Sequence, residues 1–195
     1  MRIFLAPMEG VVDHTLRELL TGIGGIDVCV TEFIRVTDHV LPDRVFQRFC
    51  PELKTQCKTA SNTPVRVQLL GGQPDPVAAN AAKAVSIGAC AIDLNFGCPA
   101  KTVNKSDGGA CLLQTPHRLY DIIKATRTAV PKDIPVTAKM RLGFNDRSQY
   151  LENAIAAYEA GATEITVHAR SKADGYKPPA YWEYIAKINE AVDIP

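Results

Sequence analysis

Short apolar runs alternate along the chain with longer stretches in which apolar residues recur at helical spacing. Runs of three to six largely apolar residues, bounded by glycine, proline or polar clusters, predict buried strands. We expect such strands at residues 3–5, 28–31, 65–70, 91–94, 136–140 and 164–168.

The stretches between these runs predict helices. Thr115-Pro116 opens the most regular one. Its inner stripe is expected to be Leu119, Ile122, Ile123, Thr126 and Val130. Asp75 and Pro76 are expected to form the N-cap and first position of another helix, which ends at Ile87.

Further helices follow from start and stop signals. Asp13 or Thr15 caps the first, and Thr15 with Glu18 also fits a capping box. Asp146 opens a helix that ends at Gly161. The side chains expected to face inward on it are Leu151, Ala154, Ile155 and Tyr158. Helices are also expected within 42–49 and over 181–191, and the rest of 32–63 as loop.

The order strand, loop, helix repeats along the whole chain and predicts a parallel β/α architecture. Gly88-Ala89 and Gly161-Ala162 precede two strands in the same way, which indicates one βα unit repeated around a barrel. No G-x-G-x-x-G motif follows a strand, so an open Rossmann sheet is disfavoured.

Proline marks the entry to two of the strands. Thr63-Pro64 and Ile134-Pro135 each lead into one, and Ile194-Pro195 stands where a seventh would begin. A (β/α)₈ barrel needs eight strands. We therefore expect residues 1–195 to be the N-terminal part of a barrel domain within a longer protein.

Composition and charge narrow the class of protein. The chain has 195 residues, 46% of them hydrophobic, and a formal net charge of +1, so no global charge indicates a nucleic-acid binder. Its six cysteines form no C-x-x-C pair and have no zinc-finger spacing, and Cys29 and Cys90 are expected in the core. We see no signal peptide and no apolar run long enough for a membrane, so we expect a cytoplasmic protein. We also expect a monomer that binds no metal.

The stretch 91–113 carries the most distinctive chemistry. About twenty residues without a clean period follow its strand, and loops of this length are usually functional. Cys98 stands just past the strand end, between Gly97 and Pro99. Gly97 allows unusual backbone angles and Pro99 restricts them, so we expect the thiol to be held by stiff backbone.

Polar residues stand at the ends of the other predicted strands, where β/α barrels carry their chemistry. They are Glu9, Gln68, Asn95, Lys139, Arg141 and His168. Buried polar groups need partners, so a polar ligand bound at this mouth is a natural explanation. Each also has a structural alternative: Cys98 as an inert thiol, Lys139 reaching solvent, and His168 as a bonded structural histidine.

Other polar and aromatic positions are less informative. A solvated face is the simplest interpretation of several basic residues, although they also suit phosphates. They are Arg44, Arg48, Lys54, Lys58, Lys101 and Lys105. Tyr176 and Trp182 are expected to pack, with stacking on a base as the alternative for Tyr176.

Four segments in order resemble one family, the tRNA-dihydrouridine synthases, and most closely its bacterial C-type subgroup. They are Ala6–Gly10, Leu94–Pro99, Lys139–Gly143 and Val167–Arg170. Phe96 stands where many members have methionine. The resemblance implies an FMN-dependent (β/α)₈ TIM barrel followed by a small helical domain. About six strands lie within this chain, so part of the FMN site and the helical domain are expected outside it.

The resemblance also implies roles for individual residues. Those expected against the flavin are Pro7, Met8, Glu9, Gln68, Lys139 and His168. Arg35, Asn95 and Tyr176 are expected to contact tRNA, with Asn95 at the uridine and Arg141 as a substrate or phosphate partner. Reduced flavin, replenished by NADPH, gives hydride to C6 of uracil. Cys98 then protonates C5, a role that suits a thiol with an ordinary pKa of about 8.5.

Two alternative functions are open at this point. Flavin dehydrogenases of free pyrimidines, of the dihydroorotate or dihydropyrimidine type, share the Asn-x-x-Cys/Ser-Pro arrangement, usually with serine where Gly97 stands. A non-catalytic tRNA-binding module that has lost its flavin is the other. Activity on free uracil without tRNA would favour the first alternative, and a colourless full-length protein would favour the second.

Overall fold

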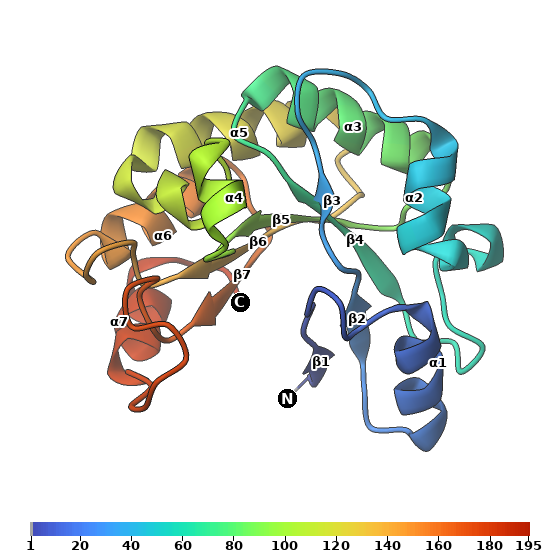
Figure 1. Cartoon of the computed structure of the whole chain (residues 1–195), viewed down its shortest axis with the longest axis horizontal. Coiled ribbons are helices and arrows are strands. Elements are labelled where there is room, and N and C mark those ends of the chain that lie inside the picture. Colours follow the sequence, from blue (N-terminus) through green and yellow to red (C-terminus); the bar gives the residue numbers. More distant parts are fainter. Residues whose placement is uncertain (1) are drawn as a thin grey trace.

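The computed structural model describes residues 2–195 and contains one parallel sheet with the strand order β1-β2-β4-β5-β6-β7. The strands are β1 Phe4–Leu5, β2 Val28–Val30, β3 Ile34–Arg35, β4 Val65–Leu70, β5 Ile92–Phe96, β6 Val136–Arg141 and β7 Glu164–His168. The sheet curls into an open half-barrel with α3 and α5 on its convex side (Figure 1). This confirms the predicted class, an α/β chain covering about six strands of a (β/α)₈ TIM barrel.

β3 was not expected from the sequence pattern. It pairs with Leu69 and Leu70 of β4, whereas β2 pairs with Val65 and Arg66 of the same strand. β2 and β3 therefore lie end to end beside β4, as one strand interrupted after Val30. The prediction of loop after residue 31 was wrong here, because two residues are too few to show a period.

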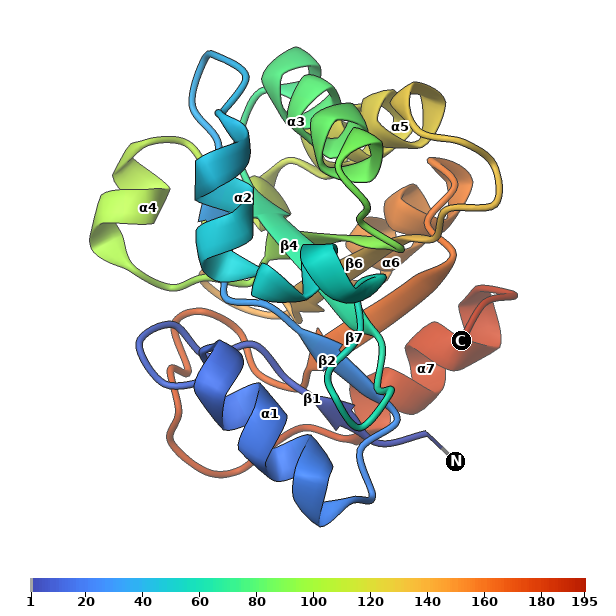
Figure 2. The same cartoon turned by 90° about the vertical axis from the view of Figure 1, so that its right-hand side faces the viewer.

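The helices lie around the outside of the half-barrel, except for the short α4, which lies at one end of it (Figures 1 and 2). They are α1 His14–Ile23, α2 Asp43–Phe49, α3 Pro74–Ser86, α4 Lys101–Lys105, α5 Pro116–Ala129, α6 Tyr150–Glu159 and α7 Glu183–Ala191, with 3₁₀ helices η1 Pro51–Thr55 and η2 Gly109–Gln114. α4 and η2 lie inside the stretch after β5 for which no period was found. That stretch is therefore not a plain loop, although both helices are short.

Side chains alternate between apolar and polar through the middle of the sheet. On β5, Ile92, Leu94 and Phe96 join the hydrophobic core, whereas Asp93 and Asn95 hydrogen-bond to polar partners. Successive side chains of a strand point to opposite faces. The apolar set therefore packs toward the helices, and the polar set faces the concave side. Each central strand contributes to the core and to the site at once.

Two predicted helix starts were wrong in detail. Asp13 caps α1 by accepting from the Leu16 amide at 2.9 Å, but Thr15 forms no capping box, and the Glu18 carboxylate accepts from the Ala60 amide instead. α3 begins at Pro74, so Asp75 lies in its first turn rather than at the N-cap. In each case a tertiary contact or a neighbouring proline sets the start.

The inner faces of the helices follow the sequence pattern unevenly. On α5 the predicted stripe is buried. α6 begins at Tyr150 rather than Asp146, and it buries Asn153, Ala154 and Ala157 while Tyr158 is exposed, contrary to prediction. Small residues allow α6 to approach its neighbours, and this is why alanines rather than the tyrosine face inward.

The two similar βα joints adopt the same structure. Gly88 and Gly161 have φ of 108° and 97°. The amide of the alanine that follows each glycine bonds back to a buried helix alanine at 3.0 Å, from Ala89 to Ala84 in one joint and from Ala162 to Ala157 in the other. A positive φ favours glycine, which explains its presence at both joints. The structure thus supports a repeated βα unit.

A buried ion pair joins α1 to η1. The Arg17 guanidinium is fully buried and donates to both carboxylate oxygens of Glu52, at 2.9 and 3.0 Å, and to the Val12 and Phe49 carbonyls. α1 thus turns Arg17 inward and leaves Leu19 62% exposed. Within residues 2–195, no helix combines the length and the apolar character needed to cross a bilayer.

Candidate functional site

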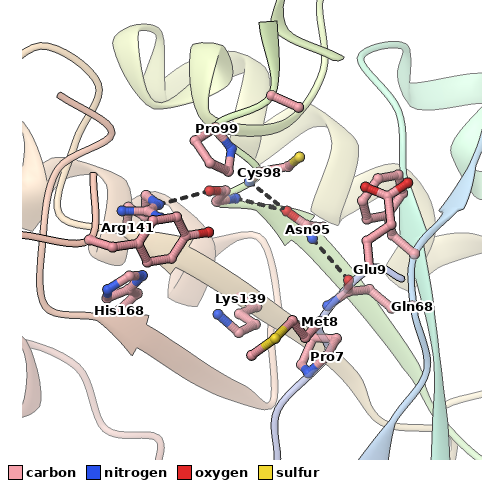
Figure 3. A pocket seen from close by; sticks show the side chains of 14 residues that line it. Pro7, Met8, Glu9, Gln68, Asn95, Cys98, Pro99, Lys139, Arg141 and His168 are labelled. Atoms are coloured by element: carbon pink, nitrogen blue, oxygen red, sulfur yellow. Dashed lines mark hydrogen bonds between the residues drawn. The ribbon is translucent and has the colours of Figure 1, made fainter. Parts of the chain in front are cut away.

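A cavity of about 420 Å³ lies at the carboxyl ends of the strands (Figure 3). Nine of the ten residues predicted for the site line it: Pro7, Met8, Glu9, Gln68, Asn95, Cys98, Lys139, His168 and Tyr176. Arg35 is exposed on β3 and does not line the cavity. The fold therefore brings together residues that are up to 169 positions apart in the sequence.

Hydrogen bonds hold the turn that carries Cys98. Asn95 Oδ1 accepts from the backbone amides of Gly97 and Cys98, both at 2.9 Å. The Cys98 carbonyl in turn accepts from the Asn104 side chain and from the Ala110 amide, both at 3.1 Å. The turn is held as predicted, but Gly97 does not contribute in the predicted way. Gly97 does not have a positive φ, and a Cβ there would make an ordinary 3.6 Å contact with Arg141.

The thiol of Cys98 is half-buried at the cavity wall. Burial raises its pKa, and the nearby Glu9 carboxylate acts in the same direction. A backbone hydrogen bond with Ala100 and the charges of Arg141 and Arg35 oppose the shift without cancelling it. The thiol therefore keeps its proton near neutral pH. Such a group can donate a proton to a molecule in the cavity.

Two amides and a carboxylate form a chain of hydrogen bonds behind this turn. Asn95 Nδ2 donates to Gln68 Oε1 at 2.9 Å, and Gln68 Nε2 donates to Asp93 Oδ2 at 2.6 Å. Figure 3 shows the part of this chain that runs from Gln68 to the Cys98 turn. Sequence reasoning missed Asp93. The signal available was an acidic residue in the middle of an otherwise apolar run, Ala91–Leu94.

Lys139 projects into the cavity from β6 (Figure 3). Within residues 2–195 its ammonium makes no hydrogen bond or ion pair. Burial lowers the pKa of this amine, the charge of Arg141 adds to the effect, and Asp93 opposes it. An ammonium held this way is available to an electron-rich or anionic ligand.

The imidazole of His168 is neutral at physiological pH. Burial, together with the positive charges of Arg141, Lys139 and Arg170, lowers its pKa to about 4. A guanidinium only donates, so Arg170 Nη1 at 3.1 Å makes His168 Nε2 the acceptor. The remaining ring nitrogen, Nδ1, then carries the proton.

Arg141 lines the cavity, where a contact with substrate or phosphate stays a prediction, and it also braces the surrounding loops. Its side chain is 2% exposed and donates to the carbonyls of Gly97, Ser171 and Gly175 at 2.9 to 3.1 Å. Its guanidinium also lies 5.1 Å from the centre of the Tyr176 ring. Arg141 therefore connects the loops that follow β5 and β7. It has no carboxylate partner among the described residues.

The aromatic residues differ from the packing role that the sequence suggested. The Tyr176 ring is 73% exposed at the cavity edge, and Trp182 is also exposed. Packing is therefore the wrong interpretation for both. The exposed Tyr176 ring is open to stacking. Five of the six basic residues interpreted as a solvated face are exposed, and Lys58 is partly so.

The charges around the cavity are mostly positive. Lys139, Arg141 and the neighbouring Arg170 are cations, and Glu9 is the one carboxylate among the residues that line it. In residues 2–195, no three His, Cys, Asp or Glu side chains come together as a metal site would require. The cavity is suited to an organic ligand that carries negative charge or accepts hydrogen bonds.

Solved structures share the fold at low sequence identity. The carboxyl transferase domain of Rhizobium etli pyruvate carboxylase aligns with a TM-score of 0.52 at 14% identity, over 89% of this chain and 30% of that one. A 2,3-dimethylmalate lyase aligns with a TM-score of 0.51 at 17% identity, over 85% of this chain and 56% of that one. At these identities the likeness concerns the fold alone.

Sequence relatives are much closer. A tRNA-dihydrouridine(16) synthase of Shewanella oneidensis is 58% identical over all of this chain, which spans 62% of that relative. One of Pseudomonas putida is 56% identical, again over all of this chain and 60% of its own length. The chain thus spans about three fifths of these curated relatives. The family model for dihydrouridine synthase (Dus) matches residues 4–195. The chain therefore belongs to the dihydrouridine synthase family, as its motifs predicted.

Proposed function

We propose that this chain is the flavin-binding catalytic part of an enzyme that reduces uridine in tRNA to 5,6-dihydrouridine, at position 16. The observation that carries the proposal is the placement of a protonated thiol, Cys98, in one cavity with the unpartnered ammonium of Lys139 and the neutral ring of His168. The names of the relatives support the substrate and the position.

The residues around the cavity fit FMN. An ammonium with no partner and a surplus of positive charge suit an electron-rich ring system that carries a phosphate. Lys139 and Gln68 would hold the edge of the ring, His168 the ribityl-phosphate side, and Pro7 to Glu9 its remaining flank. NADPH is the proposed source of electrons, in a cytoplasmic setting where tRNA is available.

The chemistry divides between the cofactor and the chain. A bound flavin supplies hydride to C6 of the uracil. Cys98 holds a proton and gives it to C5, so that hydride and proton together saturate the C5–C6 bond. The raised pKa of Cys98 keeps this proton in place until carbon accepts it. Tyr176, exposed at the cavity edge, offers an aromatic surface for a base that has left the tRNA stack, at a cost of a few kcal/mol.

Replacing Cys98 tests the acid role. In the full-length protein, Cys98→Ala should bind flavin and be reduced by NADPH as before, but form dihydrouridine about 10²- to 10⁴-fold more slowly. Cys111→Ala is the matched control, since Cys111 is equally partly buried but lies in η2 outside the cavity lining. Undiminished activity of Cys98→Ala would remove the acid role.

The substrate is tested separately. Transfer RNA from cells without the protein should lack dihydrouridine at position 16 and keep it elsewhere. Purified full-length protein should be yellow and should reduce tRNA but not free uracil. Turnover of free uracil would point to a pyrimidine dehydrogenase instead, and a colourless protein that binds tRNA would point to a non-catalytic module.

A further inference from the structure

A buried carboxylate lies behind the cavity without lining it. Asp93 is 2% exposed, and both its oxygens accept hydrogen bonds: Oδ2 from Gln68 Nε2 at 2.6 Å and Oδ1 from the Thr137 hydroxyl. In the register of the sheet, Gln68 and Thr137 stand directly beside Asp93 on the two adjacent strands. The carboxylate is thus fixed between β4 and β6.

Donors and acceptors match along these hydrogen bonds from Asp93 to the turn that carries Cys98. An amide side chain carries a donor at one end and an acceptor at the other. Because the carboxylate accepts, Gln68 presents its NH₂ group to Asp93 and its oxygen to Asn95 Nδ2, at 2.9 Å. Asn95 presents its own oxygen to the backbone amides of Gly97 and Cys98, which can only donate.

We propose that Asp93 is a positioning residue for Cys98, acting through Gln68 and Asn95 to hold the turn that carries the thiol. The inference rests on the proposed function, because that function gives the position of the thiol its catalytic meaning. Asp93 itself touches neither the cavity nor a ligand in it.

Packing alone does not account for a carboxylate here. Burial penalises its charged form and raises its pKa, and the hydrogen bonds from Gln68 and Thr137 and the positive charges of Arg66 and Lys139 oppose this without cancelling it. With an apolar residue, however, the Gln68 NH₂ group would lose its acceptor, and the link that holds Gln68 beside Asn95 would be broken at one end. A fixed acceptor that holds Gln68 in place is therefore what the carboxylate provides.

The test follows the turn itself in the full-length protein, without tRNA. Hydrogen exchange measures the protection of the Gly97 and Cys98 amides. Site-resolved alkylation of Cys98 by iodoacetamide, followed against pH by mass spectrometry, measures the exposure and the pKa of the thiol. The variants are Asp93→Ala, which removes the acceptor at the end of the chain of hydrogen bonds, and Asp93→Asn, which keeps an acceptor for Gln68.

In Asp93→Ala, both amides should exchange about tenfold faster, and Cys98 should be alkylated about tenfold faster, as expected for loss of one buried hydrogen-bonded link. The midpoint of the alkylation profile should also move to lower pH, because the freed thiol is better solvated. Asp93→Asn should stay within about twofold of the natural protein. In the double variant Asp93→Ala with Asn95→Ala, exchange and alkylation should be no faster than in Asn95→Ala alone, because both substitutions interrupt the same chain of hydrogen bonds.

Asn80→Leu is the matched control, since Asn80 is a fully buried amide on α3 that lies outside the cavity lining. Should Asp93→Ala fail to fold, Gln68→Met breaks the next link and should give the same loosening. Unchanged exchange and alkylation in the folded Asp93→Ala or Gln68→Met protein would overturn the inference. So would equal rates in Asp93→Ala and Asp93→Asn. None of these readouts depends on dihydrouridine formation, so failure of the proposed function would be seen separately.

Discussion

Two buried arginines in this protein are satisfied in opposite ways. Arg17, between α1 and η1, donates to both oxygens of Glu52 and to two carbonyls. Arg141, at the cavity, donates to three carbonyls and has no carboxylate partner among the described residues. The first charge is neutralised within the fold, whereas the second remains as net positive charge beside Lys139 and His168.

The difference separates a structural use of charge from a functional one. A paired buried charge adds little potential to its surroundings, but breaking the pair leaves an isolated ion in a dry place. An unpaired cation held by carbonyls lends its charge to whatever enters the cavity. It also depresses the pKa of both cavity bases, Lys139 and His168. The predictions below examine this contrast, from the largest expected effect on stability to the smallest.

Arg17→Met should produce the largest loss of stability. It leaves the Glu52 carboxylate buried without its cation, which costs about 3–5 kcal/mol of unfolding free energy. Urea denaturation measures the loss. Any folded fraction should keep normal activity, since Arg17 lies outside the cavity lining. Arg17→Met combined with Glu52→Leu should recover much of the stability, and no recovery would mean that packing rather than charge dominates.

Arg141→Met should reduce the unfolding free energy less than Arg17→Met does, but it should reduce activity more. It leaves three carbonyls without their donor but no opposing charge without its partner, so a loss of about 2 kcal/mol is expected. Dihydrouridine formation per folded molecule should nevertheless fall at least about tenfold, because the loops that carry Cys98 and Tyr176 lose their common brace.

Arg141→Lys is the informative companion. It keeps the charge but cannot reach three carbonyls in the same fork geometry. Intermediate activity is therefore expected. Activity equal to the natural protein would show that charge alone matters at this position.

His168 should make stability depend on pH in a definite window. Its pKa is about 4 in the folded protein and about 6.5 when unfolded. Between these values the unfolded chain binds more protons, so the unfolding free energy falls as pH drops from 6.5 through 4. His168→Asn should flatten this part of the profile, measured by thermal melts at each pH. Identical profiles would contradict the assignment of a depressed pKa.

Lys139→Met should have the smallest effect on stability. The ammonium has no bonded partner, and burial disfavours its charge, so its removal should change the unfolding free energy by no more than about 1 kcal/mol. Flavin affinity should nevertheless fall clearly. A destabilisation as large as that of Arg141→Met would mean that Lys139 has a structural partner.

Much of the site could be predicted because its residues stand at the ends of recognisable strands. Cys98, Lys139 and His168 each follow from a local apolar run, and parallel strands bring their carboxyl ends to one edge. The interior stripe of α5 followed from its period for the same reason. Residues whose position is set by one neighbouring strand or helix can therefore be predicted from the sequence.

Residues whose role depends on distant partners were missed. The Arg17–Glu52 pair joins positions 35 apart, and no period relates the two. The bonds of Arg141 to Ser171 and Gly175, 30 and 34 positions away, were also missed because they are absent from any local pattern. β3 was missed because its two residues acquire their conformation from β4.

The amino-acid sequence by itself determined the order of the longer strands and helices, the parallel β/α barrel class of the sheet and the chemical groups at its mouth. These follow from alternation of side chains and from turn residues, which act over a few positions. The folded structure alone decided which polar groups face one another, and so which charges are neutralised and which remain available. Hydrogen bonds and burial depend on distances in space, and chain separation does not reveal those distances.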